Sequence, residues 1–178
     1  MNLPDGVSCI QLDTHVDDRG TLMECYRQSW DLPHFNQFNA VHSNTGVLRG
    51  VHVHPTHADY LLVLSGKMLL GLHDIRRESA THRQSTILEL SGEQPMCCFI
   101  PVGVVHGFYF PEPTFYVYGL SEEWNLEGDF GCRWDDPQLG LNWPVDGDPL
   151  LSRRDKNAPS YTEMVARYYR TVSQGKAQ

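Results

Sequence analysis

The sequence predicts an all-β protein, an antiparallel sandwich or barrel that carries one helix at its C-terminal end. Three observations favour this fold. Short apolar runs follow one another closely between residues 41 and 121, turn-forming sequences such as SGEQP and PEP separate them, and helical spacing begins only near residue 160. Strands at such close spacing are joined by hairpins and not by crossover helices, which argues against a parallel α/β sheet.

Six segments are predicted as strands because each is a short apolar or alternating run between turn signals. In chain order they are YLLVL (60–64), KMLLGLHDI (67–75), TILEL (86–90), MCCFI (96–100), GFYF (107–110) and TFYVYGL (114–120). Together they predict a barrel core over about residues 40–122.

The C-terminal segment is predicted to form a helix over about residues 160–174. Ser160 and Glu163 have the spacing of a capping box, in which each side chain bonds the other residue's backbone N–H. Apolar residues then recur at helical spacing, at Met164, Val165, Tyr168, Tyr169 and Val172. Because no linker or repeat interrupts the sequence, we expect a single domain over residues 1–178.

Charge and cysteine content limit the possible partners and the compartment. The net charge of −8 argues against nucleic-acid binding, which needs clustered cations, although a few arginines suffice to bind a phosphorylated small molecule. The five cysteines form no CxxC pair, which indicates reduced thiols in the cytoplasm. We expect no membrane association, because the N-terminus lacks the features of a signal peptide and no apolar run is long enough to span a bilayer.

The stretch RGVHVHPTHAD, residues 49–59, is the most unusual part of the sequence because it contains three histidines and a carboxylate. Residues two apart in a strand share a face, so His52 and His54 are expected to point into the barrel together. A hairpin return would bring Asp59 beside them, and His106 would arrive from a facing strand. These four residues suit a divalent transition metal, but a metal-free polar site and a purely structural role remain open.

The spacing of these residues resembles that of the cupin superfamily. The segment from Gly46 to Gly66 follows the first cupin motif, with Asp59 in place of the usual glutamate, and PVGVVH (101–106) resembles the second motif. The resemblance implies a cupin barrel, the double-stranded β-helix or jelly roll.

More of the chain resembles one cupin-like family, the dTDP-4-dehydrorhamnose 3,5-epimerases, which act on nucleotide-linked 4-keto-6-deoxy sugars. Nine motifs between about residues 17 and 160 occur in the family's order. They are Asp18-Arg19-Gly20 with Glu24; Gln37-x-Asn39; Gly46 to His52; Asp74-Ile-Arg76 with Ser79; Ile100 to Phe108; Tyr118; Trp134-x-Asp136-Pro137; Trp143-Pro144; and Leu151-Ser152-x-x-Asp155.

The resemblance implies a cofactor-free epimerisation that needs three catalytic residues. His52 is implied as the base that removes a proton next to the ketone, and Asp155 as the carboxylate that orients the imidazole and stabilises its cation. Tyr118 is implied as the acid that returns a proton from the other face. Its phenol suits this role because its ordinary pKa near 10 keeps it protonated.

Further residues match positions that bind the substrate in this family. Arg19 and Arg49 match diphosphate contacts, which the guanidinium fork suits well. Gln37 and Asn39 match contacts to the nucleotide base, and Glu24 matches a residue that approaches the ligand from a neighbouring subunit. The resemblance therefore implies a dTDP-linked sugar as substrate and a homodimer as the working form.

His106 matches a histidine that lines the substrate cavity in this family. Four other positions, in contrast, depart from the family pattern. Asp59 falls where the family has a lysine near the keto oxygen, His54 where it has a glutamine, Trp124 where it has a second tyrosine, and Arg154 where it has another lysine. An anion at position 59 would oppose the developing enolate. The departures indicate an unusual substrate, or epimerisation at C3 or C5 alone.

Two alternatives to the epimerase remain at this point. One is a metal-dependent cupin enzyme that uses His52, His54, Asp59 and His106, but His52 cannot be a ligand and a free base in the same state. The other is a non-catalytic protein that binds a nucleotide sugar. We favour the epimerase without a metal.

Overall fold

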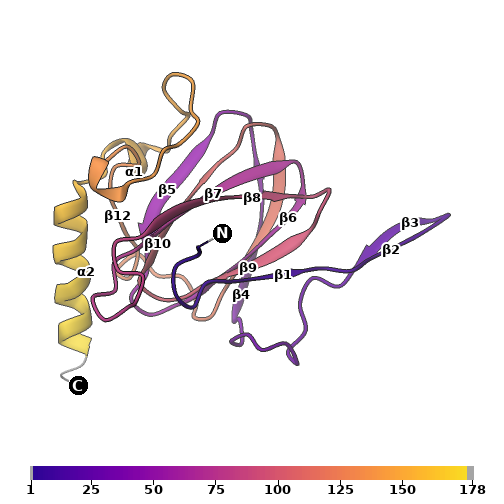
Figure 1. Ribbon diagram of the computed structural model, residues 1–178, viewed down its shortest axis with the longest axis horizontal. Helices are drawn as coiled ribbons and strands as arrows, with labels where there is room; N and C mark the ends of the chain where they lie inside the picture. The colour runs from indigo at the N-terminus through magenta and orange to yellow at the C-terminus, as the bar shows by residue number, and fades with distance from the viewer. Residues whose placement is uncertain (1, 176–178) are drawn as a thin grey trace.

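The computed structural model describes residues 2–175, in which two five-stranded sheets pack face to face (Figure 1). The first sheet has the order β1-β9-β6-β11-β4, the second has the order β12-β5-β10-β7-β8, and neighbouring strands are antiparallel. From β4 onward the chain changes sheet at every step except between β7 and β8, as a jelly roll requires. The bounds are β1 (Ser8–Gln11), β4 (Gln37–Ser43), β5 (Leu48–Val53), β6 (Asp59–Ser65), β7 (Lys67–Asp74), β8 (Ser85–Ser91), β9 (Met96–Ile100), β10 (Val104–Tyr109), β11 (Thr114–Leu120) and β12 (Phe130–Gly131).

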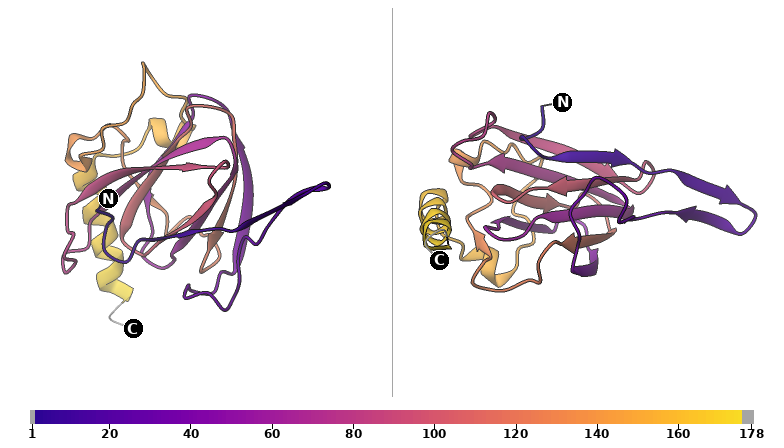
Figure 2. Two further views of the ribbon diagram at one scale, coloured as in Figure 1. Left: turned by 45° about the vertical axis from the view of Figure 1, so that its right-hand side comes forward. Right: turned by 90° about the horizontal axis from the view of Figure 1, so that it is seen from below.

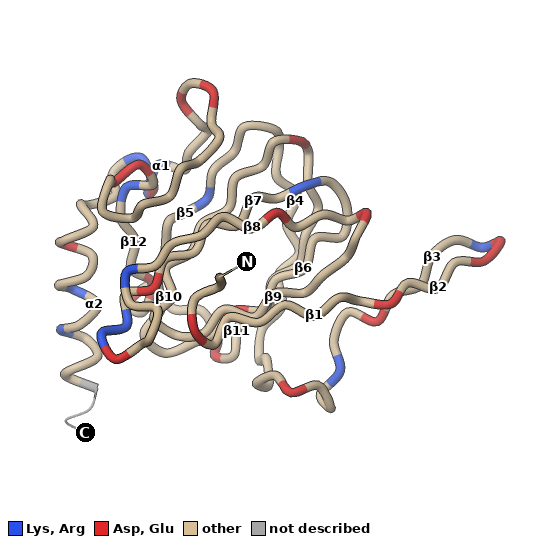
Figure 3. Tube along the Cα trace, in the orientation of Figure 1, with Lys and Arg blue, Asp and Glu red and all other residues tan. Residues whose placement is uncertain are grey.

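A separate hairpin, β2 (Thr14–Asp17) and β3 (Gly20–Met23), extends away from the sandwich, at the end opposite the C-terminal helix (Figures 1 and 2). We call residues 14–23 the arm. Its tip carries acidic and basic residues side by side (Figure 3), and Arg19 there bonds Asp17. The arm also exposes 76% of Val16 and 62% of Leu22. A two-stranded hairpin with exposed apolar side chains gains little stability from its own chain.

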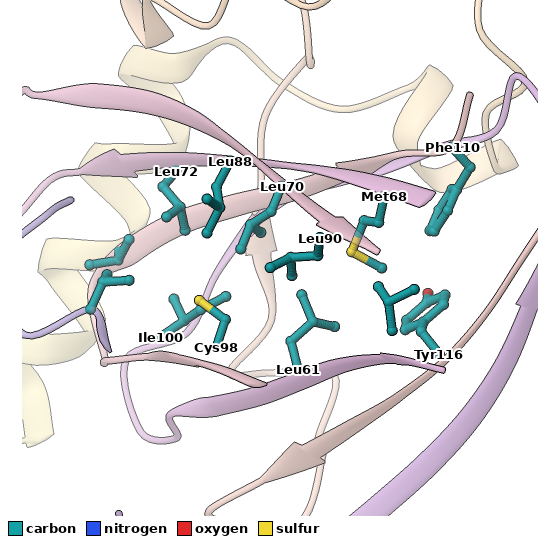
Figure 4. Close-up of a cluster of buried hydrophobic side chains, with 13 residues drawn as sticks. Leu61, Met68, Leu70, Leu72, Leu88, Leu90, Cys98, Ile100, Phe110 and Tyr116 are labelled. Atoms are coloured by element: carbon teal, nitrogen blue, oxygen red, sulfur yellow. The ribbon is translucent and has the colours of Figure 1, made fainter. Parts of the chain in front are cut away.

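The main core fills the space between the two sheets (Figure 4). Leu61 and Val63 on β6 point inward from the first sheet and meet Leu70 and Leu72 on β7 of the second. These side chains are almost completely removed from solvent, which is the main source of stability of a sandwich.

The outer face of each sheet is covered as well. On the first sheet, Tyr60 and Leu62 alternate with the inward residues and pack under Phe35 from the loop before β4. On the second sheet, the helix α2 (Tyr161–Gly175) places Met164 and Tyr168 over strands β5, β10 and β12. Two short helices, η1 (Pro137–Leu139) and α1 (Arg153–Lys156), lie in the segment between β12 and α2.

His73 on β7 connects the second sheet to this helix. Its side chain is buried, its Nδ1 lies 2.8 Å from Ser85 Oγ and its Nε2 lies 2.9 Å from Tyr161 Oη. Both ring nitrogens therefore have a hydrogen-bond partner. Burial nevertheless lowers the pKa of His73 from 6.5 to about 4.

The predicted all-β jelly roll with a C-terminal helix is confirmed. The six predicted strands correspond to β6 through β11, and the capping box forms, because Ser160 N donates to Glu163 Oε2 at 2.9 Å and Glu163 N donates to Ser160 Oγ at 3.3 Å. The sheets also include β1 and β12, which lie outside the range expected for the barrel core. The arm and α1 were not predicted from the sequence.

None of the helices in the described residues has the length and hydrophobicity needed to cross a membrane.

Candidate active site

A cavity of about 520 Å³ lies between the two sheets, a size common for small-molecule sites. The first sheet contributes residues from β4, β6 and β11, and the second contributes residues from β5 and β10. Loops after β5 and β11 and the segment leading into α1 complete the wall. The polar lining residues are Arg49, His52, His54, His57, Asp59, His106, Tyr116, Tyr118, Trp124, Asp129, Ser152, Arg154 and Asp155.

His52 and Asp155 form a hydrogen-bonded pair on one wall, which we call the dyad wall. His52 Nε2 lies 2.9 Å from Asp155 Oδ1, and Ser152 Oγ donates to Asp155 Oδ2 at 2.8 Å. Burial alone would raise the pKa of Asp155, but the hydrogen bonds from His52 and Ser152 hold it below its ordinary value of 3.8. The carboxylate therefore stays ionised beside the imidazole.

Local structure explains how this pair forms from residues distant in the sequence. Ser152 is the N-cap of α1, and its Oγ accepts from Asp155 N at 3.0 Å, which fixes the start of the helix and the position of Asp155. On β12, Gly131 is opposite His52, and a Cβ atom there would lie 2.8 Å from His52 Cδ2. A glycine at that position therefore leaves room for the imidazole ring.

His52 lies on β5 of the second sheet, whereas Tyr118 lies on β11 of the first. The two side chains therefore border the cavity from opposite sides. Its side chain is partly buried. Burial, followed by the nearby Asp59, raises the pKa of Tyr118 above its ordinary value of 10. The phenol is therefore protonated at neutral pH.

A second group, which we call the histidine wall, consists of His54, His57, Asp59, His106 and Asp129. His54 Nε2 lies 4.0 Å and His106 Nε2 lies 3.8 Å from Asp59 Oδ2, and His54 Nδ1 lies 3.6 Å from Asp129 Oδ1. The rings of His54 and His57 are stacked, with centroids 4.0 Å apart. One ligand atom from each of His54, His57 and Asp59 lies within 4.8 Å of the other two, an arrangement that can hold a metal ion.

Burial dominates the electrostatics of this wall. Desolvation lowers the pKa of His54 well below 6.5 and that of His106 to about 4, and it raises the pKa of Asp59 well above 3.8. Asp129 differs, because its burial, which would raise its pKa, is outweighed by the hydrogen bonds from Arg154 and Trp124 together with the nearby His52 and His54, so its pKa is lowered. The two carboxyl groups of the histidine wall are thus shifted in opposite directions.

Basic and aromatic side chains border the same cavity. Arg49 on β5 donates from Nε to Ser43 Oγ at 3.0 Å. Arg154 donates to the side chain and backbone oxygens of Asp129, and Trp124, 48% exposed, donates from Nε1 to Asp129 Oδ2 at 3.0 Å. Asp129 therefore fixes one arginine and one tryptophan beside the histidine wall.

The structure brings His54 and Asp59, from the predicted metal set, and seven other sequence-predicted site residues to this cavity. The seven others are His52, Arg49, His106, Tyr118, Trp124, Arg154 and Asp155. Gln37 lies next to the cavity, because its Oε1 accepts from Trp124 N at 2.9 Å and its Nε2 donates to Asn39 Oδ1 at 3.2 Å. Arg19, 91% exposed at the tip of the arm, and Glu24, which bonds Arg27, do not line it within the described part of the chain.

Two expectations about the histidines need correction. His106 does not come from a facing strand, because β10 is the neighbour of β5 in the same sheet and His106 pairs directly with His52. The set His52, His54, Asp59 and His106 is not the one that clusters, because His52 is bonded to Asp155 and His57 takes its place beside His54 and Asp59.

Sequence reasoning missed His57 and Asp129 as site residues. His57 belongs to the histidine-rich stretch and could have been included as its third histidine. Asp129 carries no spacing signal, because it reaches the cavity only through the loop between β11 and β12.

Comparisons with known proteins agree with this fold. A model of the dTDP-4-dehydrorhamnose 3,5-epimerase family matches residues 2–163. The chain is 31% identical over 163 residues to dTDP-4-dehydrorhamnose 3,5-epimerase of Methanothermobacter thermautotrophicus, which covers 86% of this chain and 88% of the relative. It is also 32% identical over 157 residues to dTDP-4-dehydro-6-deoxyglucose 3-epimerase of a Streptomyces species. That match covers 82% of this chain and 80% of the relative. A solved structure of dTDP-6-deoxy-D-glucose-3,5-epimerase from Legionella pneumophila, in complex with dTDP-4-keto-L-rhamnose, superposes with a TM-score of 0.85 at 29% identity over 92% of each chain. This chain therefore belongs to the dTDP-4-dehydrorhamnose 3,5-epimerase family.

Proposed function

We propose that this protein is a nucleotide-sugar epimerase that acts next to the 4-keto group of a dTDP-linked 4-keto-6-deoxyhexose, at C3, C5 or both. The observation that carries the proposal is the hydrogen bond of 2.9 Å between His52 Nε2 and Asp155 Oδ1 in a cavity that Tyr118 borders from the opposite sheet. Family membership supports the same reaction.

His52 removes the proton. Because a carboxylate oxygen only accepts hydrogen bonds, His52 Nε2 carries the hydrogen that Asp155 accepts, and Nδ1 keeps the lone pair that makes it basic. When Nδ1 takes a proton from the carbon beside the ketone, the ring becomes a cation next to ionised Asp155. The carboxylate stabilises that cation and holds the ring in place.

Tyr118 returns a proton to the opposite face of the enolate. It lies in the other sheet from His52, and epimerisation requires donor and base on opposite sides of the sugar ring. Because burial raises the pKa of Tyr118, the phenol is protonated and ready to donate at neutral pH.

Charged side chains around the cavity bind the diphosphate and the nucleotide. Arg49 and Arg154 border the cavity and offer guanidinium donors to phosphate oxygens, and His106 and Trp124 complete the sugar pocket. Gln37, which accepts from Trp124 N, and Asn39, which accepts from Gln37, contact the nucleotide base. These assignments extend the family pattern to the side chains that lie at or beside the cavity.

The working form is a homodimer in which the arm of one subunit completes the cavity of the other. Exposed Val16 and Leu22 on the arm favour a partner surface, and within the described residues Arg19 and Glu24 do not line the cavity that holds His52 in their own chain. The mass in solution, measured by light scattering at micromolar concentration, is expected to be that of two chains, and a monomer contradicts this part of the proposal.

The enzyme works in the reducing cytoplasm, and residues 1–178 form one catalytic domain. All five cysteines are free thiols, which supports the compartment, and one core shared by both sheets supports the single domain.

Solvent deuterium exchange tests the reaction. Incubation with a dTDP-4-keto-6-deoxyhexose in D₂O is expected to label C3, C5 or both, and proton NMR shows which carbon exchanges. His52→Asn should lower the exchange rate by about 10³-fold and leave dTDP affinity within about twofold, because the base is lost but the nucleotide contacts remain. His82→Asn, at an exposed histidine away from the cavity, is the matched control.

The proposal fails if no dTDP-, GDP- or CDP-linked 4-keto sugar exchanges at either carbon. Thermal stabilisation by dTDP without exchange would point to a binding protein instead.

A further inference from the structure

The proposed epimerisation leaves the histidine wall without an explanation. His54 Nδ1, both ring nitrogens of His57 and Asp129 Oδ1 are buried and have no hydrogen-bond partner among the described residues. Buried polar atoms are almost always bonded, because each one left without a partner costs about 1–3 kcal/mol. Several such atoms in one wall of a cavity indicate a ligand that belongs there.

The orientation of two imidazoles shows what kind of ligand would fit. His106 Nδ1 lies 3.1 Å from the carbonyl oxygen of Val104, so Nδ1 carries the hydrogen and Nε2 presents a lone pair. His54 Nδ1 faces the carboxylate of Asp129 at 3.6 Å, which likewise favours hydrogen on Nδ1 and a lone pair on Nε2. Both lone pairs face Asp59 Oδ2.

Three acceptors that converge in this way repel one another unless a shared proton or a metal ion lies between them. The separations of 3.8 and 4.0 Å from Asp59 Oδ2 are too long for hydrogen bonds. They exceed by a few tenths of an ångström the roughly 3.3–3.6 Å between two ligand atoms of a tetrahedral ion bound at roughly 2.0–2.2 Å, so small side-chain movements suffice to place an ion between them.

His57 supplies a further nitrogen. Its ring is stacked on that of His54, and a ligand atom from each of His54, His57 and Asp59 lies within 4.8 Å of the others. In a tetrahedral site such atoms lie roughly 3.3 Å apart, so side-chain rotations that move the ligand atoms together by up to about 1.5 Å close the site. Neither nitrogen of His57 would have to give up an existing hydrogen bond.

We propose that His54, His57 and Asp59, with His106 beside them, bind one divalent transition-metal ion of the zinc and cobalt class in the wall of the cavity. Neutral imidazoles and a carboxylate are the ligands such ions prefer. Asp129 orients His54, as carboxylates commonly orient metal-binding histidines.

This ligand set leaves the dyad wall intact. His52 stays bonded to Asp155 and keeps its free nitrogen, so base and metal can coexist in one cavity. A divalent ion there would supply positive charge to stabilise negative charge on the keto oxygen. That catalytic use rests on the proposed function, whereas metal binding itself does not.

Cobalt titration of protein without a histidine tag tests the site directly. After removal of metals with a chelator and dialysis, Co²⁺ is expected to bind at about one ion per chain and to give the visible absorption of a cobalt ion with nitrogen and oxygen ligands. Zn²⁺ should displace it and abolish that absorption. Binding below about one tenth of an ion per chain for both metals overturns the proposal.

Variants show whether the ion occupies this wall. His57→Gln and Asp59→Asn are expected to weaken Co²⁺ binding at least tenfold, while His82→Gln, at an exposed histidine, should leave it unchanged. Circular dichroism and thermal unfolding show that each variant is folded before titration. Wild-type affinity in folded His57→Gln and folded Asp59→Asn contradicts the proposal.

Thermal unfolding and deuterium exchange then separate the two proposals. Zn²⁺ should raise the unfolding temperature of the wild type but not of Asp59→Asn, because only a folded-state site stabilises. If the ion binds and no sugar exchanges with or without it, the epimerase proposal fails and the metal site stands. If exchange is rapid and neither metal binds, the metal site fails and the epimerase stands.

Discussion

The two walls of the cavity contain the same chemical groups in opposite conditions. On the dyad wall, Asp155 receives hydrogen bonds from His52 and Ser152, and its pKa is lowered. On the histidine wall, the Asp59 side chain has two histidine nitrogens near it but no hydrogen bond within 3.5 Å to any residue from 2 to 175, and burial raises its pKa well above 3.8. One carboxyl group is thus stabilised as an anion, and the other is not.

The difference shows that hydrogen-bond partners, and not residue type, decide what a buried carboxyl group does. Asp155 gains a compensating donor for each oxygen, so its charge is retained and can support an imidazolium. Asp59 lies opposite lone pairs, so its charge needs a cation from outside the chain. Two aspartates in one cavity can therefore have separate tasks.

The largest expected effect is on the dyad wall. Asp155→Asn removes the charge that stabilises the imidazolium and should lower deuterium exchange into the sugar by about 10³-fold. Exchange rates measured by NMR check this, with dTDP affinity expected to stay within about twofold. Asp135→Asn, at an exposed aspartate paired with Arg133, is the control. A loss smaller than about threefold would mean that Asp155 does not support the base.

His73 provides a reference for both walls, because it is a buried histidine whose two nitrogens are bonded. The unfolded chain takes up a proton at His73 near pH 6.5, whereas the folded protein does so only near pH 4. Between these values the unfolded state holds more protons, so the free energy of unfolding falls as the pH is lowered, by about 3 kcal/mol for this group over the whole window. Above pH 6.5 this group has no effect.

Urea unfolding at several pH values measures that slope. His73→Gln should flatten it between pH 6.5 and 4, and His34→Gln, at an exposed histidine that does not act on His73, should leave it as in the wild type. An unchanged slope in His73→Gln would show that the imidazole is protonated in the folded protein.

The smallest expected effect is on the free energy of unfolding of the Asp59→Asn variant, measured in the presence of a chelator. Because the pKa of Asp59 is raised by folding, its contribution to stability is present below pH 3.8 and is lost as the pH rises. An amide of the same shape avoids that loss and should raise the free energy of unfolding at pH 8 by about 1–2 kcal/mol, with a smaller gain at pH 5.

The same substitution at Asp155 should instead lower the free energy of unfolding, because the ionised form is the one that its partners stabilise. Urea unfolding of the two variants side by side compares the walls. Destabilisation by both substitutions at pH 8 would show that Asp59 has partners in solution that stabilise its charge.

Much of the fold was predictable because strand periodicity is local. The runs from residue 60 to 120 alternate or stay apolar between turn residues, and each became a strand of the sandwich. The arm was not predictable in this way, since every residue of its two strands except Met23, at the end next to the sandwich, is exposed. The four-residue helix α1 is too short for a helical period to appear in the sequence.

The site was partly predictable. His52 and His54 stand out by spacing alone, and the family resemblance pointed to Asp155 and Tyr118. His57 and Asp129 were missed because no periodicity applies to loops, and only the fold brings the loop between β11 and β12 against the end of β5.

The sequence alone determined the strand pattern, the C-terminal helix, the family and the histidine-rich stretch, since these depend on residues near one another in the chain or on motifs kept in order. Only the tertiary structure decided which histidine pairs with which carboxylate. His52 and Asp155 are 103 residues apart and meet through the cap of α1, whereas His54 and Asp59, five apart, meet without a hydrogen bond. Partners and burial are properties of the folded cavity, and they give the two aspartates opposite pKa shifts.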